Sequence, residues 1–123
     1  MKTKVITTDG QLREPEAPNT YPGVHKFFDF LIGHGWIIHR LDEDLVVVAL
    51  LRVDAPKSRN LHAEVLIRTI GIPGHRVPKL YGDAVFMGLR GNRLSRKTKL
   101  RSLPHFHDQL ISSAFSTMEE AGV

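Results

Sequence analysis

A short basic segment in the second half of the chain carries the clearest chemical signal. Six of the seventeen Lys and Arg residues fall between positions 90 and 101, and no acidic residue interrupts them. Closely spaced cations of this kind can follow the phosphates of a nucleic acid backbone. We therefore predict a ligand-binding or polyanion-binding surface made by Arg90, Arg93, Arg96, Lys97, Lys99 and Arg101.

The alternation of a β-strand decides which of these cations act together. If residues 94–101 form a strand, Lys97, Lys99 and Arg101 share one face, and Arg96 points to the other. The segment contains no aromatic residue, so it gives no support for base stacking. Three alternatives stay open: an edge strand charged to prevent edge-to-edge pairing, a surface for an acidic protein, and a site for a small phosphorylated ligand.

The chain has seven histidines, and the only cluster of them is Pro104-His105-Phe106-His107-Asp108. On the helix expected here, side chains two residues apart point about 200° apart, so His105 and His107 cannot share a metal ion. The spacing of His105 and Asp108 instead suits an internal pair. His34 and His75 follow glycines in predicted loops, and nothing in the sequence brings them together. We predict no structural metal and no cofactor.

No recognised catalytic motif occurs in the chain. A Walker-type loop, a Gly-x-Ser-x-Gly sequence and a His-Glu-x-x-His sequence are all absent. The acidic run Asp42-Glu43-Asp44 is expected to form a solvated turn. Glu64 or Asp83 would act as a base only if a pocket formed around it. We therefore predict a binding protein rather than an enzyme, with no catalytic residue assigned.

Composition places the chain among ordinary globular domains. It has 123 residues, 41% of them hydrophobic and 24% charged, which predicts one domain spanning residues 1–123. The absence of cysteine excludes disulfides, thiolate zinc sites and cysteine nucleophiles. The longest apolar run, residues 45–51, is far shorter than the roughly 20 residues that cross a bilayer. We expect a cytoplasmic protein with no membrane partner.

Charge is distributed unevenly between the two halves. Residues 1–64 have a balance of −1 and residues 65–123 a balance of +5, which together give the net charge of +4. Most of the basic excess belongs to the segment 90–101. A basic surface of this kind favours nucleic acid or an acidic host protein as the partner.

Periodicity and turn signals predict the elements that position these residues. The run 45–51 is apolar at almost every position, which is typical of a central strand covered on both faces. Residues 65–70 are rich in β-branched side chains, so a strand is an alternative to a helix there. We expect an α+β fold, with a mixed or antiparallel sheet and two to three covering helices. The expected strands are 4–8, 11–13, 36–41, 45–53, 83–89 and 94–103, and the expected helices are 22–32, 61–70 and 104–121.

Two helices are expected to use aromatic residues in packing. On the first helix, Phe30 lies outside the apolar stripe and is expected to contact a second element. On the last helix, a stripe at 3.6-residue spacing predicts a face that joins the core. Its members are Phe106, Leu110, Ile111, Ala114, Phe115 and Met118.

Three short motifs in order resemble a family of small proteins of unassigned activity, carried by bacteriophages, plasmids and actinobacterial genomes. They are Gly35-Trp-Ile-Ile-His39, Asn60-Leu-His-Ala63 and Gly82-Asp-Ala-Val-Phe-Met-Gly88, within a matching region of about residues 4–89. The basic segment and the last helix lie outside that region. The resemblance implies a small intracellular accessory protein of phage origin.

These observations predict a small, basic, non-enzymatic binding protein. We expect a phage or mobile-element accessory factor that engages nucleic acid or an acidic host protein, with a homo-oligomer as one arrangement. The alternative is a protein that binds or sequesters a small ligand such as a nucleotide. An enzyme of unrecognised type ranks third.

Overall fold

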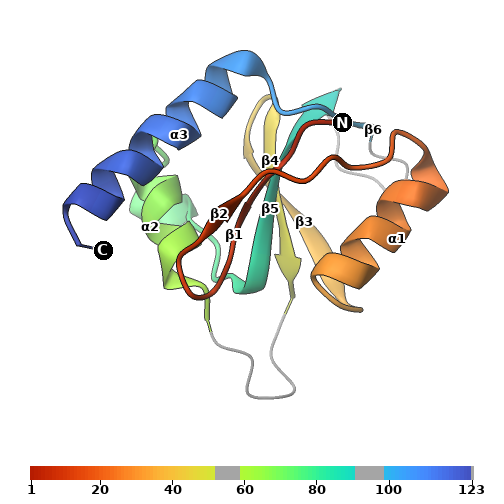
Figure 1. The fold of residues 1–123 in the computed structure, drawn as a ribbon, viewed down its shortest axis with the longest axis horizontal. Coiled ribbons are helices and arrows are strands. Elements are labelled where there is room, and N and C mark those ends of the chain that lie inside the picture. The colour runs from red at the N-terminus through yellow and green to blue at the C-terminus, as the bar shows by residue number, and fades with distance from the viewer. Residues whose placement is uncertain (52–58, 91–98, 123) are drawn as a thin grey trace.

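A six-stranded antiparallel sheet with helices on both faces forms the fold (Figure 1). The computed structural model describes residues 1–51, 59–90 and 99–122. This architecture confirms the predicted α+β class, and every strand pair in the described residues is antiparallel. The elements are β1 (Lys4–Ile6), β2 (Leu12–Arg13), α1 (Tyr21–Leu31), β3 (Trp36–Asp42), β4 (Leu45–Leu50), α2 (Leu61–Thr69), the 3-10 turn η1 (Gly74–Arg76), β5 (Tyr81–Arg90), β6 (Lys99–Arg101) and α3 (His105–Glu120).

The long strand β5 organises the sheet. The strand order is β2-β1-β5-β4-β3, and β6 also pairs with β5. β1 and β6 occupy successive stretches on the same side of β5, since Lys4 pairs with Phe86 and Lys99 pairs with Arg90. Two hydrogen bonds of Lys2 join the chain before β1 to the chain after β6. The N–H of Lys2 donates to Ser102 Oγ (3.0 Å), and its carbonyl accepts from Leu103 N (3.0 Å).

β4 is the central strand that the sequence predicts. It pairs with β3 on one side and β5 on the other, and all six of its residues are buried. Alternate side chains enter two separate cores. Val47 and Ala49 pack toward α2 and α3, whereas Val46 and Val48 pack toward α1. A strand covered on both faces has no position for a polar side chain, which explains the continuous apolar run.

The two faces of the sheet are covered unequally. α2 and α3 share one face, where Leu66, Ile67 and Ile111 are fully buried. Among the described helices, only α1 covers the other face, mainly through Val24 and Phe28. No helix in the described part of the chain is long and apolar enough to cross a membrane.

Two aromatic predictions are wrong. Phe30 is 90% exposed, because it lies on the side of α1 opposite to Val24 and Phe28, which the helix buries. Phe106 is 70% exposed, because the α3 face that meets the core begins with His107 instead. Four other members of the predicted α3 stripe lie against the core: Ile111, Ala114 and Met118 are buried and Phe115 is half-buried. The remaining member, Leu110, is partly exposed and is not part of this core cluster.

The buried side chain of Asn60 fixes the start of α2. Its Oδ1 accepts from Ala63 N (3.0 Å), while its Nδ2 donates to the carbonyls of Ile6 (2.8 Å) and Gly82 (2.9 Å). One side chain thus caps the helix and ties it to β1 and β5. The β-branched residues that follow are helical, and the strand alternative for residues 65–70 is wrong.

Candidate functional site

Three of the six predicted cations lie on the β5–β6 ladder. Arg90 ends β5 and lies directly opposite Lys99 on β6, and Arg101 lies opposite Gly88. Residues paired across two strands project to the same face, so the three cations share one face of the ladder. We call Arg90, Lys99 and Arg101 the cationic ladder. The other predicted residues, Arg93, Arg96 and Lys97, lie outside the described residues.

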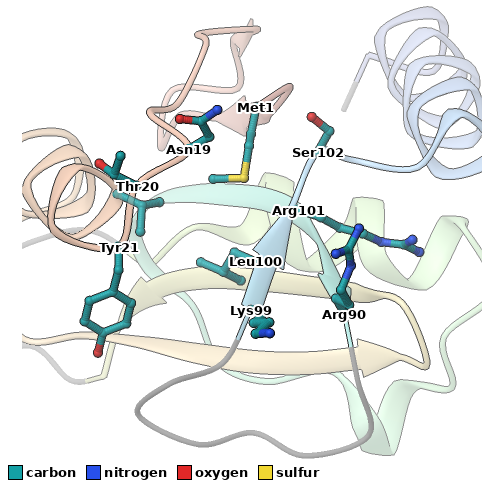
Figure 2. Close-up of a pocket in the computed structure, with 10 residues that line it drawn as sticks. Met1, Asn19, Thr20, Tyr21, Arg90, Lys99, Leu100, Arg101 and Ser102 are labelled. Atoms are coloured by element: carbon teal, nitrogen blue, oxygen red, sulfur yellow. The ribbon is translucent and has the colours of Figure 1, made fainter.

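A cavity of about 660 Å³ lies where β6 faces the start of α1. Within the described residues β6 pairs only with β5, so its other edge is open to this space. Figure 2 shows the Leu100 side chain pointing toward Thr20 and Tyr21, with Arg90 and Arg101 extending to the other side of β6. We call this space the β6 cavity. Its lining residues are Met1, Asn19, Thr20, Tyr21, Val24, Arg90, Lys99, Leu100, Arg101 and Ser102.

The lining combines positive charge with apolar surface. The cationic ladder supplies three charges, and among the described residues no carboxylate, imidazole or thiol lines the β6 cavity. Met1, Val24 and Leu100 belong to the core on the α1 side of the sheet, where Val24 is buried and the other two are partly exposed. The volume falls within the usual range of small-ligand sites. Such a lining suits a ligand that carries both negative charge and an apolar part.

Most of the charge on the cationic ladder has no partner in the described residues. Neither Arg90 nor Lys99 forms an ion pair with a described residue. Arg101 lies 3.5 Å from Asp44 Oδ2, so its charge is partly balanced. Like charges directly opposite each other on neighbouring strands are destabilising. An anion placed between Arg90 and Lys99 would relieve this repulsion.

Gly88 allows the chain after β6 to lie close against β5. A Cβ atom on Gly88 would lie 2.5 Å from the Ser102 carbonyl oxygen and 2.7 Å from Arg101 Cγ. Any other residue would therefore push β6 away from β5 and deform the β6 cavity. The sequence presents Gly88 only as one glycine inside an apolar strand, a pattern that indicates a close approach without naming the partner.

Asp44 joins the cationic ladder to α3. Its Oδ1 lies 2.7 Å from Nε2 of the buried His107, and its backbone carbonyl accepts from Leu89 N (3.0 Å). Ligand atoms of Asp42, Asp44 and His107 lie within 4.8 Å of one another, and the Arg101 guanidinium lies beside Asp44. The expected solvated turn thus holds only in part, because Asp44 bonds inward. That the chain needs no structural metal stays a prediction.

The remaining titratable candidates have structural partners or lie away from the β6 cavity. Glu64 binds Arg59 through both oxygens (2.7 and 2.8 Å) and accepts from Leu80 N (3.1 Å). Burial acts to raise the pKa of Glu64, but these hydrogen bonds outweigh it and lower the pKa. Asp83 accepts from Thr8 N at 3.3 Å. Neither carboxylate lines the cavity, and neither do the histidines singled out in the sequence.

The main partner of Asp108 is not His105, although the charge of His105 also helps to lower the pKa of Asp108. Asp108 instead forms an ion pair with Lys4 Nζ at 2.9 Å, and Lys4 also bonds Glu14. The sequence contains no local signal for this contact, because Lys4 and Asp108 are far apart along the chain.

No protein-family model, curated protein or solved structure matches this chain. The family resemblance of residues 4–89 therefore stays an expectation. The function has to be argued from the chemistry of the β6 cavity and the cationic ladder.

Proposed function

We propose that this protein binds nucleic acid, with the cationic ladder holding the phosphate backbone. The observation that carries the proposal is the direct pairing of Arg90 with Lys99, beside a cavity to which the described residues contribute no carboxylate. A fold that places two like charges opposite each other loses stability unless an external anion lies between them. The family resemblance adds the role of a phage or mobile-element accessory factor.

The length of the basic segment favours a polyanion. Arg93, Arg96 and Lys97 lie between Arg90 and Lys99 in the chain, so the connection between β5 and β6 carries further positive charge. A repeating phosphate backbone can use several such cations at once. The described lining of the β6 cavity holds cations and no carboxylate or imidazole, so these residues offer binding and charge neutralisation.

The test is a titration of labelled single-stranded and duplex DNA at two salt concentrations. If about five cations contact phosphates, the slope of log affinity against log salt should be about −4 to −5 on duplex and about −3.5 on a single strand. The double variant Arg90→Ser/Lys99→Ser should bind more weakly and show a shallower slope. The matched control is Lys26→Ser/Lys79→Ser, which removes two exposed cations from other parts of the surface. It should bind like the wild type.

Three results would overturn the proposal. The first is that the wild type does not bind DNA at low salt. The second is that Arg90→Ser/Lys99→Ser and Lys26→Ser/Lys79→Ser lose affinity equally. The third is that Arg90→Ser/Lys99→Ser dissociates an oligomer and leaves DNA binding unchanged. The third result would place the cationic ladder in a subunit interface and favour a protein partner.

A nucleotide-binding or nucleotide-sequestering role is the second candidate, favoured by the volume of the β6 cavity. A mononucleotide carries few charges, so its binding should depend weakly on salt and should saturate at one molecule per chain. Binding of a mononucleotide together with no affinity for DNA would favour this role over the first.

A further inference from the structure

The two sides of β6 offer different chemistry to one ligand. On one side, the cationic ladder presents charge without apolar surface. On the other side, Leu100 faces the start of α1 across the β6 cavity (Figure 2). Val24 and Met1 also line this cavity and extend its apolar wall. A ligand lying across the open edge of β6 therefore meets cations with one part and apolar surface with another.

We infer that the β6 cavity receives one unpaired base of a single-stranded nucleic acid while the cationic ladder holds the neighbouring phosphates. This inference rests on the proposed function and adds the class of nucleic acid. The flat, weakly polar surface of a base suits the wall made by Val24, Leu100 and Met1, and its phosphate suits Arg90 and Lys99. Residues that line the β6 cavity thus supply both the apolar surface for the base and the positive charge for the phosphate.

Tyr21 and Asn19 give this wall the means to hold a base. The ring of Tyr21 is 50% exposed at the rim of the cavity, where an aromatic face can stack on any base. Its centroid lies 4.3 Å from that of His25, which supports the ring from within α1. Asn19 presents an exposed amide at another part of the cavity lining, with one acceptor and two donors for a base edge.

A duplex satisfies only one of the two requirements. Its phosphates are on the outside and can reach the cationic ladder, but its bases are paired and stacked inside. A concave cavity of about 660 Å³ behind the edge of β6 receives a base only when that base leaves the stack. The structure therefore favours single strands, and the preference should come from the apolar wall rather than from the cations.

The first test removes the bases and keeps the phosphates. A thymidine oligomer of about 12 nucleotides is compared with an oligomer of equal length made of abasic sugars, both titrated against the wild type at low salt. The thymidine oligomer should bind about tenfold more tightly, with the same salt slope. Equal affinities for the two oligomers would overturn the inference and leave the phosphate contacts of the proposed function intact.

The second test keeps the phosphates and changes the wall. Tyr21→Leu removes the ring and Tyr21→Phe keeps it, while both remove the hydroxyl. Tyr21→Leu should weaken binding of the thymidine oligomer about tenfold and leave duplex binding unchanged, and Tyr21→Phe should bind like the wild type. The inference fails if Tyr21→Leu weakens single-strand and duplex binding equally, or if Tyr21→Phe loses as much affinity as Tyr21→Leu. Weaker binding of the Arg90→Ser/Lys99→Ser variant tests only the phosphate contacts of the proposed function. It does not test whether a base enters the β6 cavity.

Discussion

Lys4 and Lys99 both lie on short strands that pair with the same side of β5, yet their surroundings are opposite. The Lys4 side chain is 2% exposed and is held between the carboxylates of Glu14 and Asp108. Lys99 is exposed and lies opposite a second cation, Arg90, with no carboxylate beside it in the described residues. One lysine is part of the fold, and the other is presented to the outside.

The comparison shows how a structural cation differs from one available for binding. A buried ammonium group is tolerated only when opposite charges and hydrogen bonds replace its water. Burial acts to lower the pKa of Lys4, but its bonds to Asp108 and Glu14 outweigh this and raise the pKa. In the described part of the chain, Arg90 and Lys99 have no comparable set of partners. Their charge can therefore act on an external anion.

The largest effect should come from removing both partners of Lys4. The double variant Glu14→Gln/Asp108→Asn leaves a buried ammonium group without a negative charge, which should cost about 3 kcal/mol of unfolding free energy. Urea denaturation measures this cost. Lys4→Met is the matched control, because it removes the buried charge and keeps a side chain of similar length. It should change stability by less than about 1.5 kcal/mol, since buried ion pairs are often replaceable by apolar residues. Equal losses in the two variants would contradict this account.

A smaller effect should appear at acid pH. The hydrogen bond from Lys4 lowers the pKa of Asp108, which is therefore lower in the folded chain than in the unfolded chain. The stabilisation is complete above the unfolded pKa of about 4 and is lost as the pH falls through the folded pKa. Unfolding free energies measured from pH 6 to pH 2 should fall in the wild type and fall less steeply in Lys4→Met. Parallel curves would show that the Lys4–Asp108 pair does not contribute. Glu64, whose pKa is lowered chiefly by Arg59, should contribute in the same direction to both proteins.

The smallest effect should come from the cationic ladder. Arg90→Ser/Lys99→Ser should change the unfolding free energy by no more than about 0.5 kcal/mol, because exposed substitutions rarely have larger effects. Removal of the repulsion between the two charges should favour stabilisation over destabilisation. The same urea experiment measures it. A loss of more than about 1.5 kcal/mol would mean that these cations hold the sheet together, as Lys4 does.

Local signals in the sequence predicted most of the elements. The apolar run at 45–51 predicts a strand covered on both faces, and Asn60 is of a residue type that favours the start of a helix. Both patterns depend only on neighbouring residues. The pair Asp9-Gly10 lies in the turn between β1 and β2, and Gly10 adopts the positive φ (83°) that such turns need. Elements of this kind follow from hydrophobic period and capping chemistry alone.

The contacts that make the candidate site were not predictable in the same way. The bond between Asp44 and His107 joins residues 63 positions apart, and the closure of the sheet by Lys2 and Ser102 joins residues 100 positions apart. The β6 cavity needs the start of α1 to face β6, and no short pattern specifies that arrangement. The cations themselves were found because charge density is a local property. The pairing of Arg90 with Lys99 across β5 and β6 was not predictable from a local pattern.

The pairing of β1 with β5 has a consequence for how the chain folds. Lys4 pairs with Phe86, so a strand near the beginning of the chain finds its partner about eighty residues later. Sheets built on such distant pairings fold slowly, typically in milliseconds to seconds, because loop closure costs entropy before the contacts form. During synthesis on the ribosome, β1 cannot pair with β5 until β5 has emerged, so Lys4 stays solvated until then. Substitutions in the β1–β5 ladder should therefore change the folding rate more than substitutions in α1, which forms from neighbouring residues.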